Sequence, residues 1–173
     1  MNLESLFKAL SETLLMTGIS TLLAYLIGLP IGVLLNVTSK KGIKPNKVIN
    51  SVVGTIVNIL RSIPCLLLII ILIPLSNVIL GKGQWSGHWY SMIIPLVFTS
   101  FAFVARMVEQ ALNEVDAGEI EAIKSLGASN WQLITKVIIP ESRTSLISGF
   151  AVTIVSIIGY TSFAGYIAAG GLI

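Results

Sequence analysis

The feature that most constrains this chain is the placement of its charges, which leaves long stretches without an ionised side chain. Residues 13–37 and 144–173 contain no Asp, Glu, Lys or Arg. A helix needs about 20 predominantly apolar residues to cross a bilayer core. Only 11% of all residues are charged, against about 25% in soluble domains, and the mean hydropathy is +0.91. The chain is therefore predicted to be an all-α, polytopic membrane protein with one domain over residues 1–173.

Four transmembrane helices are predicted, at approximately residues 13–37, 52–80, 89–110 and 144–170. The second contains Arg61 and Pro64, so we expect one long helix with a kink there. The third is brought to a usable length by Trp89 and Tyr90, which are residue types typical of the water–lipid boundary.

Lysines indicate how these spans are oriented. The loop at residues 39–47 has no acidic residue and is rich in lysine, with Lys40, Lys41, Lys44 and Lys47. Loops that carry an excess of Lys and Arg face the cytoplasm. The amino terminus is thus expected outside, and the polar segment between the third and fourth spans is expected in the cytoplasm.

This polar segment, residues 114–140, is predicted to form two short amphipathic helices. Asp116, followed three residues later by a glutamate, has the pattern of a capping box at the start of the first helix. Gly127 is expected to end that helix in the left-handed region. Ser129 with a later glutamine starts the second helix by the same pattern, and Pro140 is expected to mark its end.

Two interpretations of the helix pair follow from its pattern alone. It could be a connector adsorbed on the membrane surface, with its apolar stripe among the lipid headgroups. It could instead be a docking site for a soluble partner. Glu114, Glu119 and Glu121 oppose adsorption to an anionic inner leaflet, which favours the partner.

The chain lacks the residues that several classes of function require. The chain has one histidine, His88, and one cysteine, Cys65, so neither a catalytic set nor a metal site is expected and the chain is not predicted to be an enzyme. No phosphate-binding G-x-x-x-x-G-K-[ST] motif occurs. If the protein uses ATP, a different chain must bind it. The lysines flank apolar spans, so nucleic acid is not an expected partner.

The polar segment also resembles a known protein family. The matching residues are Glu121, Ala122, Gly127, Ile139 and Pro140. They resemble the E-A-A, G and I-x-L-P signature of binding-protein-dependent (type I) ABC-importer permeases, with Ile123 where the signature has alanine. In that family this segment is the coupling helix, which docks into a groove of the ATPase subunit. The resemblance implies this coupling role for Ile120, Glu121, Ala122, Ile123, Leu126, Gly127, Ala128 and Pro140.

Longer blocks are similar to the methionine-importer permeases of bacteria. They are GLPIGVLLNVTSKKG, VNILRSIP, FVARMVEQALNEV, GASNWQLITKVIIPE and IGYTSFAGYIAAGGL. The resemblance implies a multi-pass homodimer in the lipid of the cell membrane, with two ATPase subunits that bind ATP and Mg and an external substrate-binding lipoprotein. That family has five spans, so we expect that this chain, which stops at Ile173, is truncated.

A translocation pathway is the remaining hypothesis. An arginine within a membrane carries a high free-energy cost and usually marks a polar cavity or a pathway. Alternatively, the Arg61 side chain could snorkel to the inner boundary of the membrane. A polar patch flanked by glycines lies in the fourth span, where close helix packing is the alternative. The candidate pathway residues are Arg61, Ser62, Pro64, Tyr160, Thr161 and Ser162.

Together these observations predict the permease subunit of an ATP-driven importer, with methionine as the substrate implied by resemblance alone. A gradient-driven secondary transporter is the first alternative, but it would be expected to carry acids within its spans. The second alternative is a membrane scaffold that recruits a soluble protein without transport.

Overall fold

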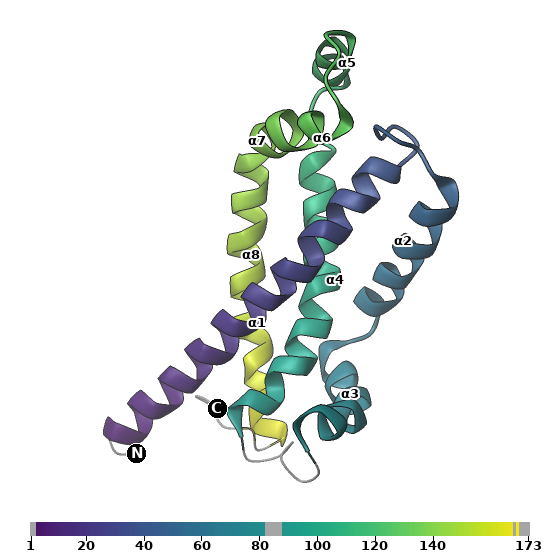
Figure 1. Cartoon of the computed structure of the whole chain (residues 1–173). Helices are drawn as coiled ribbons and strands as arrows, with labels where there is room; N and C mark the ends of the chain where they lie inside the picture. The colour runs from purple at the N-terminus through teal and green to yellow at the C-terminus, as the bar shows by residue number, and fades with distance from the viewer. Residues whose placement is uncertain (1–2, 82–87, 168, 170–173) are drawn as a thin grey trace.

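The computed structural model describes residues 3–81, 88–167 and 169, and within these ranges the chain is helical and contains no strand. Its helices form an elongated bundle (Figure 1). In chain order they are α1 (Leu3–Thr38), α2 (Lys47–Ser62), α3 (Cys65–Leu80), η1 (Trp89–Met92), α4 (Ile93–Leu112), α5 (Ala117–Ser125), α6 (Asn130–Leu133), η2 (Ile134–Ile138), α7 (Ile139–Glu141), α8 (Arg143–Thr161) and η3 (Ser162–Ile167).

The bundle has two distinct ends. The helices α5, α6 and α7 lie at one end, at the top of Figure 1, together with the loop that joins α1 to α2. The beginning of α1 and the end of α8 lie at the other end. Helices α1 and α4 run in the same direction, and α8 runs back antiparallel to them.

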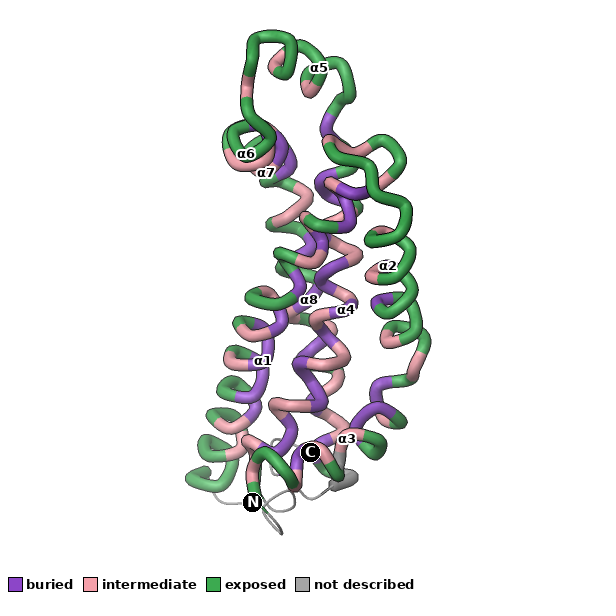
Figure 2. Tube along the Cα trace, turned by 45° about the vertical axis from the view of Figure 1, so that its right-hand side comes forward, coloured by how far each residue is buried: buried purple, intermediate pink, exposed green. Residues whose placement is uncertain are grey.

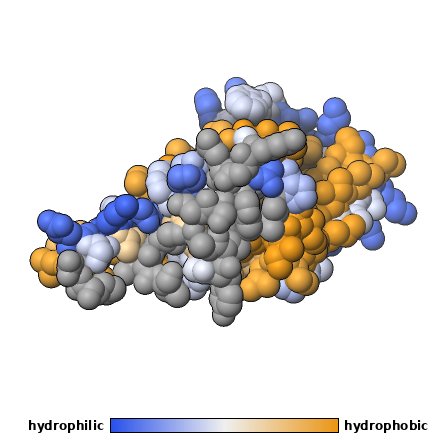
Figure 3. Space-filling view, turned by 90° about the horizontal axis from the view of Figure 1, so that it is seen from below, coloured by the Kyte–Doolittle hydropathy of each residue, from blue (hydrophilic) through white to orange (hydrophobic). Residues whose placement is uncertain are grey.

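Three helical stretches are long and apolar enough to cross a membrane, namely Leu3–Thr38, Trp89–Leu112 and Arg143–Gly165. The pair Lys47–Ser62 and Cys65–Leu72 is a fourth candidate, although the two helices are bent by 102°. The described residues thus hold three or four candidate spans. Many large hydrophobic side chains are exposed on the described helices, and Figure 3 shows some of them on the face seen from below, as expected for helices that face lipid.

The predicted single kinked helix at 52–80 is wrong in one respect, because the break is a sharp elbow between two separate helices. Ile63 has extended backbone angles, φ −82° and ψ 123°, between α2 and α3. The ring of Pro64 clashes with a helical conformation of the residue before it. Pro64 also lacks the N–H that would continue the hydrogen-bond ladder, so the helix stops and restarts in a new direction.

The helices that contain the other predicted spans have bounds of their own. The first helix starts at Leu3 rather than at residue 13 and continues through Pro30. The third predicted span, 89–110, closely matches Trp89–Leu112. In the fourth, the α-helix ends at Thr161 and a 3-10 helix follows. Residues 168 and 170 of that predicted span lie outside the described residues.

The contact between α1 and α4 is the core of the bundle, and α4 is the most buried of the three candidate spans that are not broken (Figure 2). Two glycines of α1 allow this close approach. A Cβ atom added at Gly28 would lie 2.8 Å from the carbonyl oxygen of Phe101, and one at Gly32 would lie 2.6 Å from that of Ala105. Small residues four apart let membrane helices pack backbone to backbone.

We predict that Gly32→Val weakens the fold, because the added side chain has no space against α4. Overpacking of this kind costs about 1–3 kcal/mol. Gly18→Val is the matched control on the same helix, since a Cβ there would meet nothing within 4 Å. Thermal unfolding of the detergent-solubilised protein should show a lower midpoint for Gly32→Val only. Equal midpoints in the two variants would contradict the close packing.

Candidate functional site

The polar segment between α4 and α8 forms the end of the molecule that projects furthest from the bundle (Figure 1). Its first helix, α5, begins after Asp116, whose Oδ1 accepts a hydrogen bond from the backbone N–H of Gly118 at 2.6 Å. The predicted cap is confirmed. It is not a full capping box, because in the described structure the cap bonds two residues ahead and Glu119 does not return a bond.

Gly127 confirms the predicted end of the first helix. Its φ angle is +85°, and its N–H donates to the carbonyl of Lys124 at 3.0 Å. A Cβ at this position would meet nothing within 4 Å. The requirement for glycine is therefore conformational, since residues with a side chain rarely adopt this backbone geometry.

The second helix starts with the capping box that the sequence predicted. The N–H of Gln132 donates to Ser129 Oγ at 3.3 Å, and the N–H of Ser129 donates to Gln132 Oε1 at 2.9 Å. These reciprocal bonds satisfy two N–H groups that a helix start would otherwise leave unpaired.

Pro140 does not end the second helix where the sequence predicted. The helical path continues from Asn130 through a π-helical stretch to Glu141, and the chain turns at Ser142. In this π-helical stretch the N–H of Ile139 donates to the carbonyl of Ile134, five residues back. A proline ring clashes with the carbonyl four residues before it in an α-helix, and a π-turn relieves that clash.

The candidate coupling residues differ in how they face their surroundings. Ile120 is half-buried and packs against the cluster that contains Val108, Leu112 and Ile138. Leu126 is 86% exposed. The remaining exposed members are Glu121, Ala122, Gly127 and Pro140, while Ile123 and Ala128 are intermediate. Ile120 therefore attaches α5 to the bundle, and the exposed residues form the surface open to a partner.

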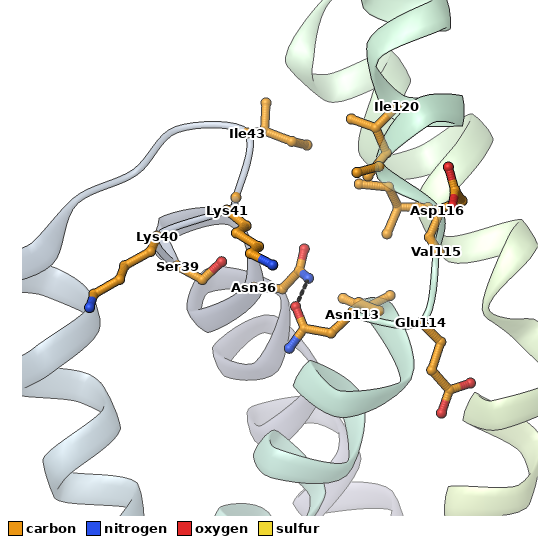
Figure 4. Close-up of a pocket in the computed structure, with 14 residues that line it drawn as sticks. Asn36, Ser39, Lys40, Lys41, Ile43, Asn113, Glu114, Val115, Asp116 and Ile120 are labelled. Carbon is orange, nitrogen blue, oxygen red and sulfur yellow. Dashed lines mark hydrogen bonds between the residues drawn. The ribbon is translucent and has the colours of Figure 1, made fainter.

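A cavity of about 680 Å³ lies under α5 (Figure 4). Lys40 and Lys41 line one side, in the loop after α1, and Asp116 and Ile120 line the other. At its floor the Asn36 side-chain amide donates to Asn113 Oδ1 at 2.8 Å, which joins the ends of α1 and α4. The cavity separates the coupling segment from the basic loop.

Arg106 joins α4 to α2 in a way that the sequence did not reveal. Its guanidinium donates to the carbonyl of Gly54 at 3.0 Å and to Asn58 Oδ1 at 3.1 Å. It also forms an ion pair with Glu109 at 2.5 Å. Only the pair with Glu109 is local in the sequence, since it lies one turn away on α4. The signal that could have found the rest is Asn58, an amide among the apolar residues of α2.

The elbow between α2 and α3 lines a cavity of about 260 Å³. Four predicted pathway residues meet there, namely Arg61, Ser62, Pro64 and Tyr160. Thr161 and Ser162 do not line it. The Thr161 hydroxyl donates to the carbonyl of Ile158 at 2.7 Å within its own helix.

Apolar helices packed on a buried central helix, with a polar helix pair at one end, define a polytopic membrane protein. The chain belongs to the family described as binding-protein-dependent transport system inner membrane components, whose model matches residues 28–173.

Relatives within this family resemble the chain over most of its length. It is 47% identical to the methionine import system permease protein MetP of Bacillus subtilis (strain 168), over 99% of this chain and 76% of that protein. It is 44% identical to the probable D-methionine transport system permease protein MetI of Pasteurella multocida (strain Pm70), over 93% of this chain and 73% of that protein. A solved inward-facing MetNI methionine ABC transporter matches with a TM-score of 0.92 and 38% identity, over 99% of this chain and 79% of that chain.

We predict that Arg106→Gln loosens α2 from α4. Hydrogen bonds to a charged group contribute about 1.5–3 kcal/mol, and this substitution removes several. Arg61→Gln is the matched control, because no hydrogen bond or ion pair joins Arg61 to another described residue. Hydrogen exchange of α2 backbone amides should rise in Arg106→Gln alone. Equal exchange in both variants would argue against this interhelical role.

Proposed function

We propose that this chain is the membrane-spanning permease subunit of an ATP-driven importer that moves methionine into the bacterial cytoplasm. The observation that carries the proposal is the agreement of both sequence and fold, over 99% of the chain, with a methionine import permease and with a methionine ABC transporter. Neither of the two cavities described above selects a thioether, so the substrate follows from this agreement.

The proposed topology has four spans in this chain, with the bent pair α2–α3 as one broken span. The amino terminus lies outside the cell, and α5 to α7 lie in the cytoplasm. Two observations support this orientation. The lysine-rich loop is at the same end of the bundle as α5, and the start of α1 is at the opposite end. Lysine-rich loops face the cytoplasm.

The segment from α5 to α7 is the proposed coupling element. We infer that a separate ATPase subunit, which binds the ATP and Mg, grips the exposed surface around Glu121 and Leu126. Ile120 holds α5 on the bundle, and the Ser145 hydroxyl donates to the Glu114 carboxylate, which ties the start of the segment to α8. A movement of the ATPase would thus reach α8 through direct contacts.

The proposed assembly is a homodimer of permeases with two ATPase subunits, and an extracytoplasmic lipoprotein delivers the substrate. The bacterial cell membrane is the proposed location, with lipid against the apolar helices. The elbow cavity at Arg61, Ser62, Pro64 and Tyr160 is the proposed pathway contact within one permease.

The test of this function is ATP-dependent uptake of labelled methionine. Cells that lack their own methionine importers would receive the full-length permease with its ATPase and binding protein. We expect uptake that unlabelled methionine competes for and that other apolar amino acids leave unchanged. Uptake of a different amino acid would overturn methionine as the substrate. Absence of any ATP-dependent uptake would overturn the assignment as an importer.

We predict that Gly127→Val uncouples ATP hydrolysis from transport. A side chain at this φ costs about 1–3 kcal/mol, so the turn should shift and uptake should fall by about tenfold while ATP hydrolysis continues. Gly127→Asn is the matched control, because asparagine tolerates the left-handed region. Uptake and hydrolysis would be measured in the same proteoliposomes. Full uptake by Gly127→Val would remove this residue from the coupling element.

A further inference from the structure

We propose that Arg61 binds the carboxylate of the amino acid as it crosses the membrane, so that the elbow cavity is a carboxylate subsite of the pathway. This inference rests on the proposed function. It adds the chemical group that the cavity recognises and the residue that recognises it.

A comparison of the two arginines near the contact of α2 with α4 supports the assignment. Arg106 donates to Gly54 and Asn58 and pairs with Glu109. Arg61 has no hydrogen bond or ion pair among the described residues, and its side chain is exposed. Arg106 is thus committed to holding helices together, whereas the donors of Arg61 are available to a ligand.

The surroundings of Arg61 provide no permanent counter-charge. Neither α2 nor α3 contains an acidic residue, and Glu109, the acid on α4, is already paired with Arg106. A charged side chain within the membrane usually pairs with a partner or lines a pathway. A carboxylate that arrives and leaves with the substrate meets this requirement, and the planar guanidinium fork matches carboxylate geometry.

The rest of the cavity suits a zwitterion with an apolar side chain. Thr99 and Tyr160 are polar residues of the lining, and Leu60 and Phe103 are apolar ones. No acid lines the cavity among the described residues, so the site would hold the substrate by one charged end only. Weak binding suits a transport pathway, because the substrate has to leave again.

The cavity is also connected to the coupling segment. Tyr160 lies in the last turn of α8, and α8 begins at Arg143, directly after the turn at Ser142 that follows α7. The helix α8 therefore runs from the end of the coupling segment to the cavity that Tyr160 and Arg61 both line. A displacement of α8 would change the distance between Tyr160 and Arg61, and so open or close the subsite.

The experiment compares methionine with methioninamide, which lacks the carboxylate. Equilibrium binding of each labelled compound would be measured with the full-length permease–ATPase complex in nanodiscs, and ATP-driven methionine uptake would be measured with the binding protein added. Variants are Arg61→Gln, Arg61→Lys, and Lys44→Gln as a control that removes a cation outside the cavity.

We expect Arg61→Gln to weaken methionine binding by about tenfold or more, to leave methioninamide binding unchanged and to lower uptake accordingly. The methionine affinity of Arg61→Lys should lie between those of the wild type and Arg61→Gln, because lysine keeps the charge but loses the planar guanidinium fork. Lys44→Gln should match the wild type in the binding of both compounds and in uptake.

Three results would overturn the subsite. They are methionine binding by Arg61→Gln within about twofold of the wild type, an equal loss for methionine and methioninamide, and failure of Arg61→Gln to assemble with the ATPase, which would assign a structural role. All three leave methionine uptake by the wild type intact. Absence of that uptake would instead overturn the proposed function, so the two failures are distinguishable.

Discussion

The approach of α1 to α4 at Gly28 and Gly32 is the contact on which the rest of the bundle depends. In lipid there is little hydrophobic gain from helix association, so packing and polar contacts must supply it. The two glycines bring the α1 backbone against the carbonyl groups of Phe101 and Ala105. With α4 fixed in this way, its remaining surface packs against α2, α3 and α8.

Polar groups within the bundle serve two different purposes. Several hydroxyls donate to their own helix, such as Thr17 to the carbonyl of Thr13 at 2.9 Å and Thr153 to that of Gly149 at 2.8 Å. These bonds pair the donors of the two hydroxyls within the apolar interior. Arg106 crosses between helices instead. A charge-assisted contact of that kind fixes the position of α2 more firmly than apolar packing alone.

Much of this structure could be predicted from local sequence, and what could not depends on distant residues. Uncharged stretches indicated the long apolar helices. The helix starts at Asp116 and Ser129 and the end at Gly127 were correct because each depends on atoms within a few residues. Pro64 indicated a kink, but the 102° bend also depends on what α3 packs against. The partners of Arg106 on α2 lie 48 and 52 residues away. No local pattern specifies such a pairing.

The length of α1 has a consequence for the protein in its membrane. Its 36 residues extend over roughly 54 Å at 1.5 Å per residue, well beyond a hydrocarbon core of about 30 Å. Figure 1 shows α1 running obliquely across α4 and α8, and such a tilt takes up part of the excess. A change in bilayer thickness would therefore change the tilt of α1. Because Gly28 and Gly32 hold α1 against α4, it would also change how these two helices cross at the centre of the molecule.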